Sequence, residues 1–349
     1  MTNTRTPTST HVERPERVEP ADLDRWLGQG YFRMRQSMFS TRFVLFEGVL
    51  RTAVWTRLPL DGFVFRGGLL RRLRANQRRF RVTIRPFVPD AAHEAVYAAY
   101  RAVARGERSE TVIDMLRNEG DEDVFHTRVL DVWDGDRLAA FSLFDEGWES
   151  VQSIAGVYDP EYASRSLGIF TLCQEILHAQ ATGKRYHYAG YVLPGVPAMD
   201  YKHAVGELEG WDADERRWMP FAERMGAGLE ADHMVRALVT AQDALRQAGV
   251  DALLHSYPEF EGPAWSPELA ACLDQPMYLA LPSRDSGVRT LITWDVANRC
   301  YELCKVLSAV GTFVPKGRPQ RSVQLWLVRS RRPVEGGAEA LAAAVTSRA

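Results

Sequence analysis

Three strand-like runs in the middle of the chain constrain its fold more than any other feature. They read DVFHTRVLDVW, RLAAFSLFD and SVQSIAGVYD, and they are separated only by Asp134-Gly135 and by Glu146-Gly147. Runs rich in β-branched and aromatic residues form strands, and two-residue turns of this kind join antiparallel neighbours. The sequence therefore predicts an antiparallel meander.

Helices are predicted on both sides of this meander. The preceding segment DAAHEAVYAAYRAVARG has apolar residues at helical spacing and Asp90 as N-cap. In the following segment, SLGIFTLCQEILHAQATGK, Ser166 is placed to cap a helix that Gly183 ends, and a strand-like YHYAGYVL comes next. This order resembles the GNAT-type acyltransferase fold. The predicted class is α+β, with a mainly antiparallel sheet flanked by helices.

Composition shifts suggest five segments along the chain. The first twenty residues are polar and have no hydrophobic period, so they cannot bury enough surface to fold. A hairpin is predicted around Glu47-Gly48. We expect a disordered leader over 1–20, a β-rich basic lobe over 21–86, a GNAT-like domain over 87–225, an α/β extension over 226–330 and a flexible tail over 331–349.

The composition favours a globular, cytoplasmic protein. No window approaches eighteen uninterrupted apolar residues, and the first residues lack the apolar core of a secretory signal. Four cysteines in 349 residues are too few for a disulfide framework. We expect no cofactor, no metal, no membrane partner and no DNA partner.

The formal charge of −2 conceals an uneven distribution. Residues 62–89 contain eight arginines and no acidic residue. Helical spacing would place Arg71, Arg74 and Arg78 on one face, and a one-sided basic patch is typical of nucleic-acid binding. The alternative is that some of these arginines cover apolar surface or pair with the acidic segment 119–123.

Two further segments carry motifs. Residues 158–170 read YDPEYASRSLGIF, and residues 186–211 read YHYAGYVLPGVPAMDYKHAVGELEGW. The ordered blocks D-P-x-Y, S-L-G-x-F, Y-x-G-Y-x-x-P-G, M-x-Y-K and L-E resemble the C-terminal domain of the arginyl-tRNA–protein transferases. The basic segment LLRRLRANQRRFRV is similar to that family's L-x-R-N segment, with Asn76 in register. The resemblance covers roughly residues 25–220.

The sequence also departs from this family and from acetyltransferases. The family's N-terminal cysteine cluster has no counterpart in residues 31–60, so a metal, iron–sulfur or haem role is not carried over. The stretch Ser164–Gly168 has one glycine and lacks the Q/R-x-x-G-x-G/A turn that holds the pyrophosphate of acetyl-CoA. An ordinary acetyltransferase is therefore disfavoured.

The resemblance implies an aminoacyltransferase of the N-degron pathway. It would move an amino acid from the 3′ ester of a charged tRNA to the α-amine of a protein that begins with Asp or Glu. Arginine is favoured as the donor because acidic residues lie near the Tyr201-Lys202 loop. Leucine, used by related enzymes, is the alternative donor, and a small-molecule or peptide amine is the alternative acceptor. A non-catalytic RNA-binding module is a third hypothesis, which retention of all the motif blocks disfavours.

The resemblance also suggests roles for individual residues. Tyr201 and Lys202 would contact the acceptor's acidic side chain, and His203 would relay a proton with His187 near the site. The candidate catalytic residues are Tyr201, Lys202 and His203. The candidate substrate-binding residues are Arg165 for the acceptor; Ser166, Leu167 and Gly168, whose amides would meet a phosphate or the oxyanion; Tyr188 and Tyr191, which would stack on the terminal adenine; and Asp200 and Glu209, which would bind a guanidinium. The candidate tRNA-binding residues are Arg71, Arg72, Arg74, Arg78 and Arg79.

Overall fold

An eight-stranded sheet is the framework of the central unit, which consists of residues 13–40 and 54–226. The C-terminal unit consists of residues 1–12, 41–53 and 227–349. The computed structural model describes residues 9–104, 108–118, 121–283, 287–313 and 321–347, and among these it describes only the backbone of residues 198, 200, 201, 204 and 313.

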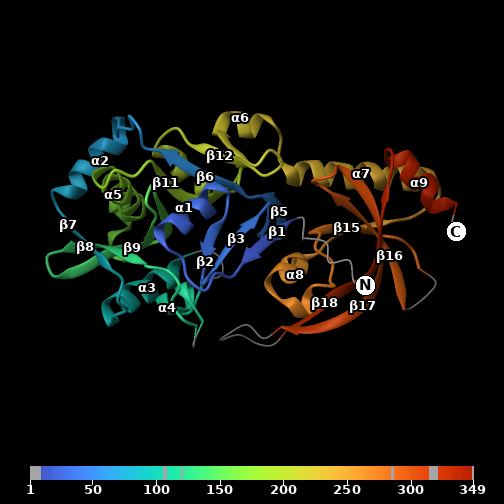
Figure 1. Cartoon of the computed structure of the whole chain (residues 1–349), viewed down its shortest axis with the longest axis horizontal. Coiled ribbons are helices and arrows are strands. Elements are labelled where there is room, and N and C mark those ends of the chain that lie inside the picture. Colours follow the sequence, from blue (N-terminus) through green and yellow to red (C-terminus); the bar gives the residue numbers. More distant parts are fainter. Residues whose placement is uncertain (1–8, 105–107, 119–120, 284–286, 314–320, 348–349) are drawn as a thin grey trace. The chain divides into compact units, whose positions relative to one another are not determined.

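The strands of the central sheet follow the order β13-β12-β6-β11-β10-β9-β8-β7 (Figure 1). Only β10 and β11 are paired in parallel, and the other neighbours are antiparallel. The predicted meander is confirmed as β8, β9 and β10. The strands are β6 (Val54–Pro59), β7 (Arg81–Pro86), β8 (Arg128–Asp134), β9 (Arg137–Glu146), β10 (Ser150–Tyr158), β11 (Tyr186–Val192), β12 (Glu209–Asp212) and β13 (Arg217–Pro220).

Helices cover both faces of this sheet. Helices α3 (Ala91–Val103) and α4 (Val112–Leu116) pack with Val129 and Leu143 on one face. Helices α2 (Gly67–Gln77) and α5 (Leu167–Ala181) pack with Leu130 and Phe144 on the other. Side chains alternate between the faces of a strand, so neighbouring residues such as Val129 and Leu130 enter different cores. The predicted α+β class is confirmed.

Shorter elements complete the central unit. They are α1 (Pro20–Gly28), the antiparallel strands β2 (Phe32–Met34) and β3 (Ser37–Thr41), the 3₁₀ turns η1 (Pro160–Arg165) and η2 (Pro197–Ala204), and α6 (Phe221–Gly226). As predicted, Asp90 caps α3, and its side chain accepts a hydrogen bond from the His93 amide at 3.0 Å.

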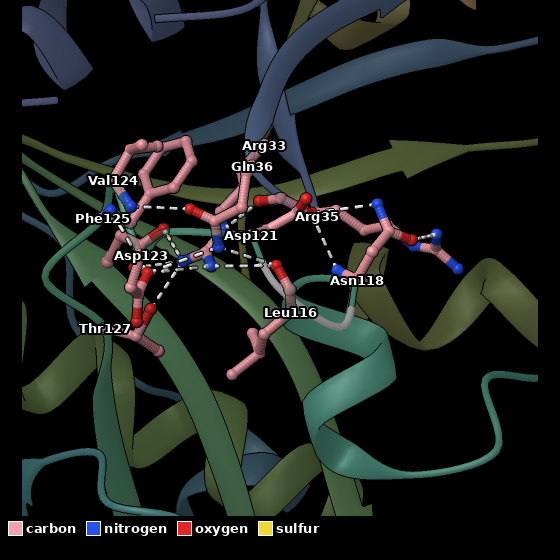
Figure 2. Close-up of polar contacts among 11 residues, drawn as sticks. Arg33, Arg35, Gln36, Leu116, Asn118, Asp121, Asp123, Val124, Phe125 and Thr127 are labelled. Atoms are coloured by element: carbon pink, nitrogen blue, oxygen red, sulfur yellow. Dashed lines mark hydrogen bonds and ion pairs between the residues drawn. The ribbon is translucent and has the colours of Figure 1, made fainter. Parts of the chain in front are cut away.

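A buried arginine ties β2 to the central sheet. The guanidinium of Arg33 donates to both carboxylate oxygens of Asp145 at 3.0 Å and also to the Thr127 hydroxyl. It lies 4.1 Å from the ring centroid of Phe125. Figure 2 shows the contacts of Arg33 with Leu116, Asp123 and Thr127. Because the Arg33 side chain is only 1% exposed, its pairing with Asp145 is required to offset the cost of burying the charge.

The C-terminal unit has its own sheet and core. Five antiparallel strands follow the order β14-β15-β16-β17-β18, and helices α7 and α9 contribute Met234, Leu238 and Leu341 to the same core as Leu291 and Cys304 (Figure 1). The elements are β1 (Thr10–Glu13), β4 (Phe43–Phe46), β5 (Val49–Thr52), α7 (Glu230–Gln247), β14 (Leu253–Ser256), η3 (Pro258–Glu261), α8 (Gly262–Trp265), η4 (Pro267–Leu269), β15 (Met277–Ala280), β16 (Val288–Asp295), β17 (Cys300–Phe313), β18 (Arg321–Val334) and α9 (Ala338–Thr346).

The two units divide the chain differently from the five expected segments. The hairpin predicted around Glu47-Gly48 forms as β4–β5, but Phe43 of this hairpin packs in the core of the C-terminal unit. Strands β6 and β7 of the expected basic lobe join the same sheet as the expected GNAT-like domain.

Both expected ends of the chain contain regular structure. Within the leader expected over 1–20, residues 10–13 form β1, where the Thr10 and Thr41 hydroxyls lie 2.8 Å apart. Within the expected tail, α9 forms because Leu341 has a core to enter. Among the described residues, no helix has both the length and the apolar character needed to cross a membrane.

Candidate functional site

A cavity of about 450 Å³ opens where β10 and β11 separate. The two strands pair only between residues 150–152 and residues 186–188. Beyond this register, Ser153, Gly156 and Tyr158 of β10 and Ala189 of β11 border the cavity. The other lining residues come mainly from α2, α5 and the two 3₁₀ turns: Arg72, Tyr100, Ala163, Ser166, Gly168, Ile169, Thr171, Leu172, Glu175 and Lys202.

The first turn of α5 borders this cavity. Ser166 adopts a left-handed conformation with φ of 53°, because it ends η1 and begins α5 at a sharp change of direction. Ser166 is the N-cap residue of α5, as predicted, but its side chain makes no capping hydrogen bond. The first backbone amides of an α-helix have no partner within the helix and carry partial positive charge. The cavity therefore faces an end of α5 that suits an anion.

Leu167 and Gly168 have different surroundings from Ser166. Leu167 is fully buried in the core of the central unit, whereas Gly168 lines the cavity. A Cβ atom on Gly168 would meet Tyr158 at an ordinary 3.8 Å. A Cβ atom on Gly156 would lie 3.1 Å from the Thr171 hydroxyl, so Gly156 is the glycine that permits close approach of α5 to β10. Gly156 was not among the residues predicted from the sequence.

A buried carboxylate forms part of the cavity wall. Glu175 of α5 is fully buried, and its Oε2 lies 2.9 Å from Nε2 of His187 on β11. The Ser153 hydroxyl donates to its Oε1 at 3.3 Å. Within the part of the chain that the structure describes, no lysine or arginine pairs with Glu175. Glu175 was not predicted from the sequence, although an acid within the apolar run LCQEIL was a usable signal.

Lys202 borders the same cavity from η2. Its Nζ donates a hydrogen bond to the carbonyl oxygen of Tyr191 at 2.7 Å and lies 5.9 Å from the Tyr191 ring centroid. Burial disfavours the charged form and lowers the pKa of Lys202 to about 8. The cavity thus combines a buried carboxylate with an amine that is mostly charged at neutral pH.

The predicted tRNA-binding arginines are all exposed, on α2 or directly after it. Leu73, Asn76 and Phe80 are buried, so the helix turns Arg71, Arg72, Arg74, Arg78 and Arg79 outward. Among the described residues, only Arg79 of these five forms an ion pair, with Asp134 at 2.7 Å. The alternative partner segment 119–123 lies partly outside the described residues.

Two contacts connect this basic surface with the cavity. Arg72 itself lines the cavity. The Asn76 side-chain amide donates to the carbonyl oxygen of Arg165 at 3.0 Å, which holds α2 against the junction of η1 and α5. The Arg165 side chain is exposed and does not line the cavity.

Tyr188 and Glu209 are engaged by Arg57 outside the cavity. Arg57 Nη1 donates to the Tyr188 hydroxyl at 3.3 Å, and Arg57 Nε donates to Glu209 at 2.6 Å. Burial raises the pKa of Tyr188 to about 12. Tyr188 was expected to stack on adenine and Glu209 to bind a guanidinium. In the structure both contact Arg57, and neither lines the cavity.

The remaining predicted residues are dispersed. The Tyr191 ring packs edge-on against Trp55, with 5.1 Å between centroids. His203 is exposed, and its ring centroid lies 4.6 Å from that of Phe221. Asp200 and Tyr201 belong to η2, but their side chains lie outside the described residues.

Comparison with known proteins shows that the region around this cavity is similar to a known family. Residues 92–212 match the family model described as arginine-tRNA-protein transferase, C terminus. This range includes most of the cavity wall, from Tyr100 to Lys202, but not α2 or the C-terminal unit.

Several relatives are named aspartate/glutamate leucyltransferase. The protein from Leptospira interrogans is 36% identical over 85 residues, which are 24% of this chain and 33% of that protein. The protein from Xanthobacter autotrophicus is 29% identical over 216 residues, which are 56% of this chain and 84% of that protein. The chain thus spans only about a third of the Leptospira relative. Among solved structures, L-PGS from Bacillus licheniformis has a TM-score of 0.31 and 14% identity, covering 41% of this chain and 48% of that one.

The family match and these relatives agree with the resemblance carried by the motifs of residues 158–211. Over residues 92–212, the chain is similar to the arginine-tRNA-protein transferase family.

Proposed function

We propose that this protein is an aminoacyl-tRNA–protein transferase. It moves an amino acid from the 3′ ester of a charged tRNA to the α-amine of a protein that begins with Asp or Glu. The observation that carries the proposal is one cavity that adjoins an exposed arginine surface, a helix N-terminus and Lys202. The family match and the names of the relatives support the same class of reaction.

The reaction needs little chemical activation. The α-amine nitrogen attacks the ester carbonyl, a C–N bond forms, and the C–O bond to the tRNA ribose breaks. The amine loses a proton and the ribose oxygen gains one. An α-amine has a pKa of about 7.7–8.0, so a useful fraction is neutral at physiological pH. Positioning of the two reactants can therefore supply most of the rate acceleration.

In this proposal, the arginines around α2 bind the tRNA backbone and Arg72 guides the 3′ end into the cavity. Charge-assisted contacts to phosphates position nucleic acid without reading its sequence. The backbone amides at the start of α5 stabilise the oxyanion that develops during attack. This use of Ser166 and Gly168 agrees with their position on the cavity wall.

Lys202 is proposed to bind the acidic side chain of the acceptor. Its Nζ lies at the cavity and donates one hydrogen bond to a backbone carbonyl, and an ammonium group has three donors, so donors remain for a carboxylate. With a pKa of about 8, the amine is charged when the acceptor binds at neutral pH. Tyr201 and His203 remain proposed neighbours of the acceptor on the basis of the motif alone.

Arginine is the proposed donor because of Glu175. A fully buried carboxylate that no described lysine or arginine pairs with favours an incoming cation, and a guanidinium is a matched partner. Leucine is the second candidate, favoured by the names of the relatives and by the apolar side chains of Ile169 and Leu172 on the cavity wall.

The proposal is tested by mixing the protein with arginyl-tRNA or leucyl-tRNA, each carrying a labelled amino acid, and one of three peptides. The peptides begin with Asp, Glu or Ala and are otherwise identical. The expected result is incorporation of arginine into the Asp- and Glu-led peptides alone. Incorporation of leucine would select the second donor, and absence of transfer from both donors would overturn the proposed function.

A further inference from the structure

Two tyrosines line the cavity, and we call them the tyrosine pair. Tyr158 is the last residue of β10, and Tyr100 belongs to α3. Their ring centroids lie 5.3 Å apart, and the two rings meet edge to face. Both residues are half-buried, so the protein core does not enclose either side chain.

The hydroxyl groups of the tyrosine pair are not used to hold the fold. Among the described residues, neither hydroxyl has a hydrogen-bond partner. Tyr97, which precedes Tyr100 on α3, differs in this respect. It is 3% exposed, and its hydroxyl donates to the carbonyl oxygen of Ser109 at 2.9 Å. A buried tyrosine usually has such a partner, whereas the tyrosine pair keeps its polar ends available to a ligand.

The tyrosine pair lies at the opposite end of the cavity from Glu175. At one end, a Cβ atom on Gly168 would meet the Tyr158 ring at 3.8 Å, and Ser166 lies next to it along α5. At the other end, the Ser153 hydroxyl donates to Glu175. The helical rise of about 1.5 Å per residue separates Ser166 from Glu175 by roughly 14 Å. The cavity is therefore elongated, with aromatic rings at one end and a carboxylate at the other.

This arrangement suits the 3′ end of an aminoacyl-tRNA. The terminal adenosine carries the amino acid on its ribose, so the base and the amino-acid side chain extend in different directions from the ester. Unpaired bases of RNA stack on aromatic side chains. With the donor side chain directed toward Glu175, or against Ile169 and Leu172, the adenine reaches the end of the cavity that holds the tyrosine pair.

Positive charge lies beside the tyrosine pair. The guanidinium carbon of Arg108 is 5.9 Å from the ring centroid of Tyr100, and this arginine is exposed. Arg72 lines the same cavity. The phosphate that precedes the terminal adenosine is negatively charged, so both arginines favour RNA backbone at this end of the cavity.

We propose that Tyr100 and Tyr158 form an adenosine subsite, in which their rings stack on the 3′-terminal adenine of the donor tRNA. The inference rests on the proposed function, because it takes an aminoacyl-tRNA as the donor. It applies to either candidate amino acid, since the terminal base is the same. It also moves the stacking role from Tyr188 and Tyr191, neither of which lines the cavity.

The test measures binding of two uncharged tRNAs to the full chain by fluorescence anisotropy. One tRNA is intact, and the other lacks only its 3′-terminal adenosine. Tyr100→Leu and Tyr158→Leu remove the rings, whereas Tyr100→Phe and Tyr158→Phe keep them. Tyr31→Leu is the matched control, because Tyr31 is a half-buried tyrosine of the same unit that packs against Trp26 outside the cavity. Thermal unfolding by circular dichroism verifies that the variants fold.

The wild type is expected to bind the intact tRNA about 5- to 100-fold more tightly than the truncated one. Each leucine variant should bind the truncated tRNA as the wild type does and lose most of this preference. The two phenylalanine variants and Tyr31→Leu should keep it. Because Tyr158 also packs against the core, Tyr100→Leu decides the question if Tyr158→Leu does not fold.

Three results would overturn the adenosine subsite. They are a wild type that binds both tRNAs equally, a folded leucine variant that keeps the full preference, and a leucine variant that loses the same affinity for both tRNAs. The last result would mean that the ring acts elsewhere than on the terminal adenosine.

The proposed function can fail separately. If the leucine variants lose the preference but the wild-type chain transfers no amino acid, the adenosine subsite stands and the proposed reaction falls. If transfer proceeds and the preference is absent or unchanged in the variants, the reaction stands and this inference falls.

Discussion

Oε2 of Glu175 lies 2.9 Å from Nε2 of His187, and both side chains are only 1% exposed. The pair joins α5 to β11 beside the cavity that we assign to substrate. The Ser153 hydroxyl donates a further hydrogen bond to this carboxylate, so a charge in the protein interior is held by polar groups rather than by any lysine or arginine that the structure describes. Such a carboxylate is prepared for a cationic ligand.

Glu175→Gln is expected to separate the two donors. The amide has nearly the size of the carboxylate and one acceptor oxygen but no charge, so kcat/KM for arginine transfer should fall about 10- to 100-fold. Leucine transfer, if present, should change by no more than a few-fold. Glu149→Gln, an exposed acid paired with Arg185, is the matched control. Equal loss in both variants would remove Glu175 from donor recognition.

The pH dependence of acceptor binding reports on Lys202. Because burial lowers its pKa from 10.5 to about 8, the charge that attracts the acceptor's carboxylate is present below pH 8 and lost as the pH rises above it. The KM for an Asp-led peptide should increase up to about tenfold per unit above pH 8. In Lys202→Arg the KM should stay flat to beyond pH 9. A wild-type KM that is constant from pH 7 to 9.5 would contradict the role assigned to Lys202.

The salt dependence of tRNA binding tests the arginine surface around α2. Replacing Arg71 and Arg74 with Gln should reduce the log–log salt slope by about 1.4–1.8. The pair Arg101→Gln and Arg185→Gln removes the same charge from other exposed positions of the central unit and should leave the slope unchanged. An unchanged slope in the α2 variant would exclude these two arginines from phosphate binding.

The Arg33 cluster predicts a large effect on stability. Arg33→Met leaves the Asp145 carboxylate buried without a cation, so the free energy of unfolding should fall by about 3–5 kcal/mol in urea titrations. Arg35→Met, which removes an exposed contact with Asn118, should cost less than about 1 kcal/mol. A small effect of Arg33→Met would show that the pair does not anchor β2 to the sheet.

The order of elements in the central unit was predictable because its signals are local. Turns at Asp134-Gly135 and Glu146-Gly147, the Asp90 cap and the period of α5 each depend on a few neighbouring residues. The assignment of β4–β5 to the C-terminal unit was not predictable, because it depends on Phe43 packing beside residues nearly two hundred positions away.

Part of the site was predictable because local sequence motifs mark its residues. The motifs located Lys202, Ser166 and Gly168, which line the cavity, and the charge run located Arg72. Glu175 borders the cavity because β10 and β11 separate there, and Gly156 lets α5 approach β10 closely. Both properties depend on the assembled sheet and not on neighbouring residues in the sequence. Tyr188 and Glu209 follow the motif, but Arg57 from a different strand engages both of them.

The most direct test of the proposed function compares two acceptors that differ in one charge. Peptides beginning with Asp or with the isosteric Asn are incubated with the protein and charged arginyl-tRNA, and transfer is followed by mass spectrometry. The proposed function predicts addition of one arginine to the α-amine of the Asp-led peptide and little or none to the Asn-led peptide. Equal addition to both peptides would contradict recognition of the acidic residue, and addition to neither would contradict arginyl transfer itself.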